Sequence, residues 1–284
     1  YEVADNWQQP ARGASHKDVP AVAVDSHDRV FLFTRNDSQV LVYDSDGRFV
    51  ETWGKGIFAS GHGITIGPDD SVYCVDNEDH TIRKFTPDGR LLMTIGTPGV
   101  CSETGYVLDP NNRALASETI RCAAGPFNKC CNLALAPNGD IYVADGYGNA
   151  RVHQFSAKGE LLRSWGEPGS GPGQFRLPHG IWITPDERLL VADRENERIQ
   201  FFDLYGKYLY EWTDVQFPCQ VQSDAAGLIY VAELCVRPGA KSFTQGIAAE
   251  EAPGRVSIFD ANGTLLARWG SLVEPCAPGN FVAP

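Results

Sequence analysis

The sequence lacks both a long hydrophobic run and a basic cluster. No apolar stretch approaches the roughly 20 residues that a membrane-spanning helix needs. Lys and Arg number 24 against 36 Asp and Glu, which leaves a formal net charge of −12. Proteins that neutralise the phosphates of DNA or RNA present a basic surface instead. We therefore expect neither a membrane nor a nucleic-acid partner.

The CxxC spacing typical of metal-binding and redox motifs is also absent, although the chain contains eight cysteines. Eight is many for a cytosolic enzyme and few for a disulfide scaffold of this length. Cys101 and Cys122 bracket an irregular insert and are candidates for a disulfide, whereas the adjacent Cys130 and Cys131 would seldom pair without strain. We expect most of the thiols to be free and buried.

The chain begins at Tyr1, without Met. This start fits both the removal of an export signal and a trimmed chain, and the residues leave both open. We favour a secreted or periplasmic location over a cytoplasmic one, and we expect a monomer.

Short strands separated by turn residues recur at an even spacing. Each of five copies contains an apolar strand, a turn, a strand ending in Asp or Glu, a third strand, a turn with Gly and a last strand ending in Trp-Gly or its remnant. The turn glycines are Gly47, Gly89, Gly159, Gly206 and Gly263. The first two lie 42 residues apart (89 − 47), within the range of propeller repeats. The pattern predicts an all-β propeller of four-stranded blades.

The repeats predict a single domain over residues 1–284. The expected blades cover 19–54, 61–96, 130–166, 178–212 and 218–270. Residues 1–10 have no blade of their own and are expected to close the ring as an outer strand on the last blade. APGNFVAP at 277–284 repeats GPGQFRLP at 171–178, which is followed by His179. We therefore expect a sixth blade to begin at 277–284, with a His directly after Pro284 and roughly 40 further residues; a five-bladed ring is the alternative.

Two long segments interrupt the repeats. Residues 97–127 lie between the second and third copies, and residues 236–253 lengthen a hairpin of the fifth. Long loops in a compact domain form lids or rims, or are disordered. We expect both segments on the rims of the propeller.

The residue that precedes the first strand of each blade is expected to face the central channel. These five positions hold Pro20, His62, Cys131, His179 and Cys219. Two imidazoles at equivalent positions, each followed by Gly-Ile, predict a metal site. A third His after Pro284 would complete the three nitrogen ligands, with an open fourth position, that are typical of catalytic zinc. Two alternatives are that the histidines are hydrogen-bonded channel residues, or that they form a closed four-ligand site with the two cysteines.

Three motifs carry a family resemblance: IYVADGYGNARVHQF at 141–155, GQFRLPHGI at 173–181 and VADRENERIQFF at 191–202. In this order and at one-blade spacing, they closely resemble motifs of the peptidyl-α-hydroxyglycine α-amidating lyase (peptidylamidoglycolate lyase) family, whose blades are NHL repeats. A looser likeness covers FLFTRNDS and GHGITI, so the resemblance spans most of the chain. It implies a six-bladed propeller with a catalytic zinc and a structural calcium.

The resemblance also implies the metal ligands. His62 and His179 match the first two zinc ligands, and the third lies beyond Pro284. The family's calcium is held partly by backbone carbonyls, which map to Val22 and Ile64, and by a carboxylate that directly follows the third His.

The family's catalytic tyrosine corresponds to Tyr147 in DGYGN, and its active-site arginines correspond to Arg35 in LFTRND and Arg194 in ADREN. The lyase reaction cleaves the N–Cα bond of a carbinolamide, so a base must take the hydroxyl proton. A phenol with an unperturbed pKa of about 10 is a poor base at neutral pH, but nearby zinc and a guanidinium would stabilise the phenolate. A guanidinium also grips a carboxylate through two donors. The structural alternatives are a rim tyrosine and, for Arg194, an ion-pair network with Asp193, Glu195 and Arg198 at a blade corner.

The sequence departs from the family at Gly61, where Pro is usual, and at Gly148, where the animal enzymes carry a disulfide Cys. It contains no monooxygenase domain. Our first interpretation is a metal-dependent lyase that cleaves an N-acyl-α-hydroxyglycine-type carbinolamide to an amide and glyoxylate, with a small-molecule or peptide substrate. The alternatives are a metal-assisted hydrolase or lactonase and a non-catalytic NHL-repeat binding protein.

Overall fold

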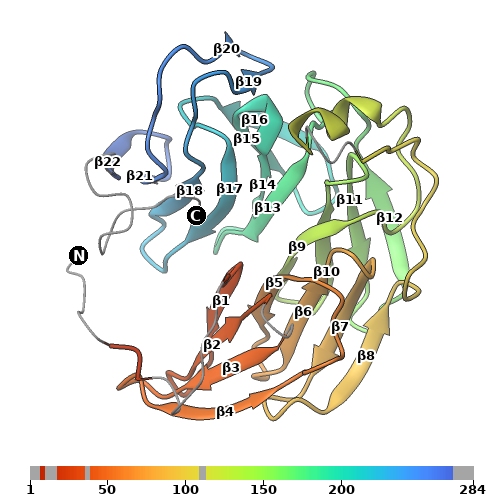
Figure 1. The fold of residues 1–284 in the computed structure, drawn as a ribbon, viewed down its shortest axis with the longest axis vertical. Coiled ribbons are helices and arrows are strands. Elements are labelled where there is room, and N and C mark those ends of the chain that lie inside the picture. Colours follow the sequence, from red (N-terminus) through yellow and green to blue (C-terminus); the bar gives the residue numbers. More distant parts are fainter. Residues whose placement is uncertain (1–6, 10–17, 36–38, 109–112, 271–284) are drawn as a thin grey trace.

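A computed structural model of the chain describes residues 7–9, 18–35, 39–108 and 113–270. These ranges contain five four-stranded antiparallel sheets that follow one another around a central axis (Figure 1). The innermost strand of each sheet contacts that of the next. The predicted all-β propeller is thereby confirmed, with each sheet inside its expected blade limits. The expected start of a sixth blade at 277–284 lies outside the described residues.

Within each sheet the strands are hydrogen-bonded in chain order from the axis outward. The first two blades comprise β1 (Ala21–Val24), β2 (Val30–Phe33), β3 (Val40–Tyr43), β4 (Phe49–Trp53), β5 (Gly61–Ile66), β6 (Val72–Asp76), β7 (Thr81–Phe85) and β8 (Leu91–Ile95). The next two comprise β9 (Cys130–Leu135), β10 (Ile141–Asp145), β11 (Arg151–Phe155), β12 (Leu161–Trp165), β13 (Pro178–Ile183), β14 (Leu189–Asp193), β15 (Arg198–Phe202) and β16 (Tyr208–Trp212). The fifth comprises β17 (Pro218–Ser223), β18 (Ile229–Glu233), β21 (Arg255–Phe259) and β22 (Leu265–Trp269).

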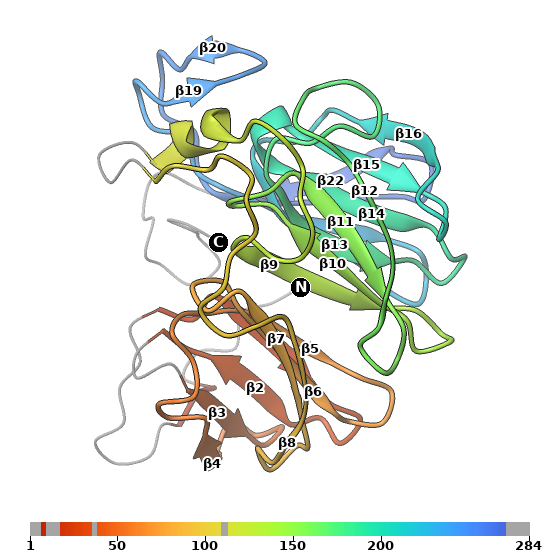
Figure 2. The same cartoon turned by 90° about the vertical axis from the view of Figure 1, so that its right-hand side faces the viewer.

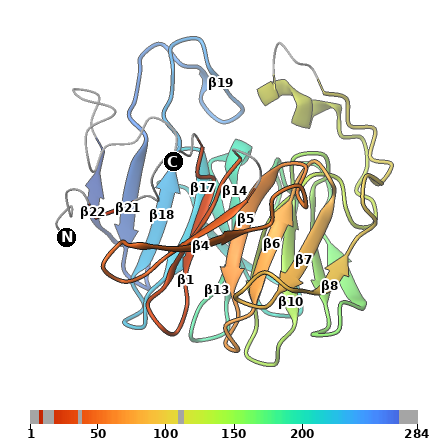
Figure 3. The same ribbon diagram turned by 60° about the horizontal axis from the view of Figure 1, so that its bottom comes forward.

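The two long segments lie at one end of the propeller, as expected. The insert after blade two contains the 3₁₀ helix η1 (Arg113–Thr119), and the extension in blade five forms the short hairpin β19 (Lys241–Ser242) and β20 (Gly246–Ile247). Figures 2 and 3 show both rising from the same rim. A second 3₁₀ helix, η2 (Arg194–Asn196), follows β14. No helix in the described ranges is long and apolar enough to cross a membrane.

Neighbouring blades are joined by the contact between a tryptophan and a turn glycine, except that Met93 and Ile95 of blade two take the tryptophan's place against Gly159 of blade three. Trp53 ends the outer strand of blade one and packs against Gly89 in the outer turn of blade two, where a Cβ would lie 2.6 Å from the indole. Trp165 meets Gly206 in the same way, with its ring 2.7 Å from the position of a Cβ. The five turn glycines all have positive φ, between 80° and 87°. Glycine is therefore required twice over, for the turn and for the close approach.

Residues 7–9 lie against blade one. Trp7 contacts Gly47, the turn glycine of that blade, and the indole Nε1 donates to the carbonyl of Ser45 at 3.0 Å. Gln9 pairs with Arg48 in a parallel bridge. Trp7 thus takes the place on Gly47 that the preceding blade's tryptophan takes elsewhere. The prediction that this segment lies on the last blade is therefore wrong for residues 7–9, whose backbone hydrogen bonds are made with Gly47 and Phe49 of blade one. Residues 1–6 and 10 lie outside the described residues.

The described cysteines are all free. Four of them, Cys74, Cys130, Cys131 and Cys219, are buried, as expected for thiols that pack as small apolar groups. Cys101 and Cys122, the candidate pair, are exposed free thiols, so the structure does not contain the disulfide considered for them.

Candidate functional site

The two histidines enter the channel at irregular points of their strands. His62 lies in β5 between Gly61 and Gly63, and His179 lies in β13 after Pro178; at both places the pairing register with the next strand shifts. A bulge of this kind redirects a side chain that would otherwise lie on one face of the sheet. His62 and His179 therefore point at the axis from blades two and four.

Each imidazole is oriented by the blade that follows it. Nδ1 of His62 lies 2.7 Å from the carbonyl oxygen of Cys131, and Nδ1 of His179 lies 2.7 Å from that of Cys219. A carbonyl can only accept, so both Nδ1 atoms carry the proton and both Nε2 atoms present a lone pair. The cysteines at the channel positions thus orient the histidines through their backbone carbonyls, which accept the Nδ1–H hydrogen bonds.

Tyr147 joins the two imidazoles. Its hydroxyl oxygen lies 3.2 Å from Nε2 of His62 and 3.1 Å from Nε2 of His179. The centroids of the His62 and His179 rings are 4.9 Å apart. One hydroxyl proton can serve only one of two acceptor nitrogens, so the other Nε2 is left facing an oxygen without a donor. Buried nitrogens in this position fit a cation between them.

The protonation of the imidazoles agrees with that fit. Burial lowers the pKa of His62 from 6.5 to about 4, partly offset by its bond to the Cys131 carbonyl. Burial, together with the proximity of His62 and Arg194, lowers the pKa of His179 well below its ordinary value. Both rings are neutral at pH 7, which is the form that binds metal, and the Nδ1–H to carbonyl bond is the usual support of a ligand histidine.

The alternative closed site of two His and two Cys is not formed by the described residues. In the described part of the chain, the only three or more His, Cys, Asp or Glu with ligand atoms within 4.8 Å of one another are Asp25, His27 and Asp70. That group lies in turns at the opposite end of the blades. Burial also raises the pKa of the Cys131 thiol to about 12, which disfavours the thiolate that metals bind.

Arg194 lies over the ring of Tyr147. Its guanidinium carbon lies 5.4 Å from the centre of the phenol ring, and Nη1 is 3.4 Å from the hydroxyl oxygen. Its Nε donates to Glu195 at 3.0 Å, and its backbone N–H donates to the carbonyl of Leu177 at 3.1 Å. Burial raises the pKa of Tyr147, and the positive charge of Arg194 opposes that increase.

Arg35 approaches the same centre from blade one. Its Nε donates to the carbonyl of Gly61, next to His62, at 3.3 Å. The structure therefore brings together the catalytic and zinc-ligand residues implied by the resemblance: His62, His179, Tyr147, Arg35 and Arg194. The ion-pair alternative for Arg194 holds in part, since Glu195 is its partner.

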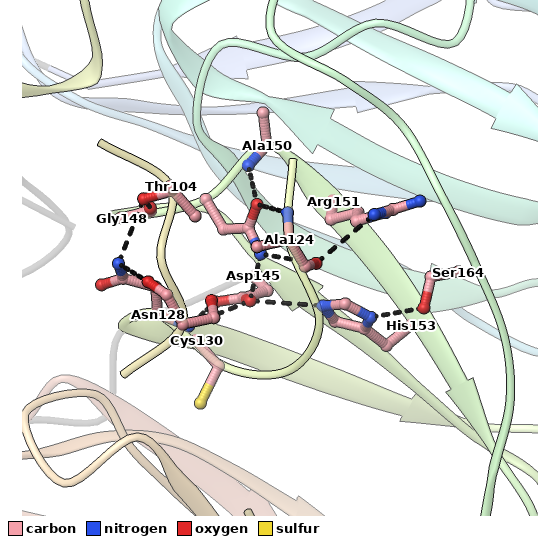
Figure 4. Close-up of polar contacts among 12 residues, drawn as sticks. Thr104, Ala124, Asn128, Cys130, Asp145, Gly148, Ala150, Arg151, His153 and Ser164 are labelled. Atoms are coloured by element: carbon pink, nitrogen blue, oxygen red, sulfur yellow. Dashed lines mark hydrogen bonds and ion pairs between the residues drawn. The ribbon is translucent and has the colours of Figure 1, made fainter. Parts of the chain in front are cut away.

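The turn that carries Tyr147 is held by a buried carboxylate. Asp145, at the end of β10, accepts from the backbone N–H of Asn128 at 3.0 and 3.1 Å and from the amide of Asn149 at 2.9 Å. His153 lies 3.2 Å from the same carboxylate, with its other nitrogen 2.7 Å from Ser164 (Figure 4). Asp76, Asp193 and Glu233 likewise accept a hydrogen bond from a backbone N–H just before the innermost strand of their blades. The acidic end of the second strand thus positions the channel residue.

The insert after blade two is tied to the same turn. Thr104 donates to the carbonyl of Gly148 at 2.6 Å and accepts from the side chain of Asn128 at 3.2 Å (Figure 4). A Cβ at Gly148 would lie 2.1 Å from the Asn128 side chain, and one at Gly146 would lie 2.1 Å from the Pro178 carbonyl. The glycines of DGYGN therefore let Tyr147 approach both the insert and blade four.

A cavity of about 640 Å³ opens above this centre. Arg35, Tyr147 and Arg194 line it together with Glu195 and with both rim segments. Four further lining residues occupy one repeated position, two residues before the channel residue: Ser60, Lys129, Leu177 and Phe217. The sequence comparison missed these four and Glu195, although aligning the repeats two positions further upstream would have identified the four.

The implied calcium ligands lie on two of the innermost strands. Val22 is on β1 and Ile64 on β5, the innermost strands of adjacent blades. The Val22 residue is 55% exposed, whereas Ile64 is 5% exposed. A role for their carbonyls in binding calcium stays a prediction.

Comparisons with known proteins agree with the fold and the motifs. A family profile described as a six-bladed β-propeller matches residues 131–252. Peptidyl-alpha-hydroxyglycine alpha-amidating lyase 1 of Drosophila melanogaster is 33% identical over 180 residues, 58% of this chain and 29% of that protein. NHL repeat-containing protein 3 of Homo sapiens is 32% identical over 206 residues, 68% of this chain and 54% of that protein. These relatives confirm the resemblance drawn from the motifs.

The chain spans less than two thirds of the length of either relative. Among solved structures, one described as a streptogramin B lyase superposes with a TM-score of 0.57 over 89% of this chain and 70% of its own, at 14% sequence identity. At that identity the likeness concerns the fold alone.

Proposed function

We propose that this protein is a metal-dependent lyase that cleaves the N–Cα bond of an N-acyl-α-hydroxyglycine to an amide and glyoxylate. The observation that carries the proposal is the position of the Tyr147 hydroxyl, between Nε2 of His62 and Nε2 of His179 and beneath Arg194. Lyase activity in the named Drosophila relative is a second support.

The reaction needs a proton to move from the substrate hydroxyl to the amide nitrogen. As the hydroxyl loses its proton, a C=O forms, the N–Cα bond breaks, and its electron pair goes to the nitrogen, which takes up a proton. Tyr147 is the acid–base group in this proposal, since it lines the cavity and its hydroxyl lies between the two imidazoles. Its proton returns to the amide, so no co-reactant is consumed.

Arg194 and Arg35 supply positive charge around Tyr147. Burial raises the pKa of Tyr147, so the buried phenol needs nearby cations before it can accept a proton as phenolate. Arg194 contacts the phenol oxygen directly. Arg35 reaches the same cavity and is assigned the substrate carboxylate, which a guanidinium binds through paired donors.

A zinc ion, which His62 and His179 would hold through Nε2, would supply Lewis-acid activation and further positive charge beside Tyr147. A third ligand from outside the described residues would complete the site. Calcium, with Val22 and Ile64 as carbonyl ligands, is a second, structural part of the proposal.

The test is glyoxylate release from an N-acyl-α-hydroxyglycine by the purified, zinc-loaded protein. We expect release above the uncatalysed rate, and stoichiometric amide as the second product. Ester and lactone substrates form the control, because a metal-assisted hydrolase would turn those over instead. Metal binding without glyoxylate release would contradict the lyase assignment. If the protein neither binds metal nor releases glyoxylate, the interpretation as a non-catalytic propeller is favoured.

A further inference from the structure

The cavity above Tyr147 has two unlike halves. At the repeated lining position, blades two and three present Ser60 and Lys129, whereas blades four and five present Leu177 and Phe217. Lys129 is paired with Glu78 at 2.5 Å, on the polar side. The side of blades two and three is therefore polar and charged. We call the side of blades four and five the apolar half after Leu177 and Phe217, although Arg194 and Glu195 of blade four also line the cavity.

The blade-five extension and the two residues before it continue the apolar half. Leu234 and Cys235 directly precede the extension, Ala240 lies within it, and all three line the cavity with Phe217. The N–H of Leu234 donates to the carbonyl of Phe217 at 3.2 Å, which fixes this wall to the start of β17.

Contacts to blade four hold the extension in place. Glu197, which follows η2, accepts from Thr244 at 2.5 Å and from Gln245 at 2.8 Å. The guanidinium of Arg176 lies 4.5 Å from the ring centre of Phe243. Because η2 begins at Arg194, the segment that carries the catalytic guanidinium also anchors the wall.

The wall is linked to the insert across the rim. Lys241 forms an ion pair with Glu118 at 2.6 Å, between segments 123 residues apart in the chain. The insert adds Tyr106 and Leu108 to the cavity lining. Both rim segments thus border the apolar half.

We propose that this apolar half, lined by Leu177, Phe217, Leu234, Cys235 and Ala240, is the subsite for an apolar acyl group of the substrate. The inference rests on the proposed function, because Arg35, Tyr147 and Arg194 would hold the reacting, carboxylate-bearing end in the same cavity. An aliphatic or aryl chain buries its surface against these side chains. A peptide in the same place would leave backbone N–H and C=O groups without partners.

The experiment compares α-hydroxyglycines with N-acetyl, N-butanoyl, N-hexanoyl and N-octanoyl groups. We expect kcat/KM for glyoxylate release to rise with chain length by up to about fourfold per methylene, as burial of CH₂ groups predicts. Ala240→Phe should lower kcat/KM for the octanoyl substrate more than for the acetyl substrate and so remove the advantage of the longer chain. Ala225→Phe, exposed in the β17–β18 turn at the far end of the same blade, is the matched control.

Binding of N-acylglycines, which have no hydroxyl to react, is measured in parallel by calorimetry. If no substrate releases glyoxylate, the proposed function fails, but an affinity that rises with acyl length and falls in Ala240→Phe still supports the subsite. Affinity that is flat across the series, or equal losses for acetyl and octanoyl compounds, would overturn it. If Ala240→Phe does not fold, Leu234→Ser makes the same wall polar without added bulk and is judged by the same comparison.

Discussion

Tyr147 is the residue on which the proposed chemistry depends, because His62, His179 and Arg194 all meet its hydroxyl. Tyr147→Phe removes that oxygen and keeps the ring. We predict that the variant retains metal while kcat falls about a hundredfold or more, the usual effect of losing a general base. Glyoxylate release and metal content measure the two effects.

The matched control for this change is Tyr205→Phe, which removes the hydroxyl of a tyrosine that is 76% exposed in the turn between β15 and β16. It should keep kcat close to the wild-type value, since Tyr205 is not among the residues that line the cavity. A Tyr147→Phe enzyme that turns over at the wild-type rate would refute Tyr147 as the base.

His62 gives the metal-free protein a pH-dependent stability. Its pKa is about 4 in the folded protein and 6.5 in an unfolded chain, so the unfolded chain binds a proton first as the pH falls. Stability should therefore decrease between pH 6.5 and pH 4, by about 2 to 3 kcal/mol from this group by pH 4.5.

Urea unfolding with EDTA at pH 7.5 and pH 4.5 measures this loss. His62→Gln keeps a side-chain donor for the Cys131 carbonyl but does not titrate, so it should lose less stability on acidification than the wild type. Equal losses in the two proteins would show that His62 does not remain neutral in the fold.

At the scale of the elements, the contact between an outer-strand tryptophan and the next turn glycine joins one blade to another. Gly89→Ala would place a methyl group against the Trp53 ring and strain a residue with φ of 84°. We predict a loss of about 2 to 4 kcal/mol in the free energy of unfolding, from the strain and the overpacking together.

Gly99→Ala separates these two contributions. Gly99 has φ of 70°, but a Cβ there meets nothing within 4 Å, so only the backbone strain of about 1 kcal/mol should appear. Thermal or urea unfolding gives both values. A Gly89→Ala loss no larger than that of Gly99→Ala would mean that the Trp53 contact does not constrain the blades.

For the whole molecule, the proposed metal would tie together blades that do not adjoin. His62 belongs to β5 and His179 to β13, with blade three between them. A ligand that binds only the folded state stabilises it, so chelation should lower the thermal midpoint by several degrees. Calorimetry of the zinc-loaded protein with and without EDTA tests this, and His62→Ala should remove the response. The same midpoint with and without the chelator would count against a metal between the blades.

The four-stranded sheets and their approximate limits were predictable from local patterns in the sequence. Strand alternation, turn glycines and the acidic end of the second strand are repeated in each copy, so aligning the copies located the blades. The same alignment placed His62 and His179 at one level of the channel, and the family motifs added Tyr147, Arg35 and Arg194.

Contacts between distant segments were decided only by the tertiary structure. The Lys241–Glu118 pair, the Glu197 anchor of the extension and the split between polar and apolar halves join parts of the chain with no shared pattern. The sequence also did not decide whether Cys101 and Cys122 form a disulfide, and the structure shows both as free thiols. A repeat can be predicted from the sequence because each copy makes the same local hydrogen bonds and packing contacts. The rim segments have no repeat, so their positions depend on the surfaces that the assembled blades present to them.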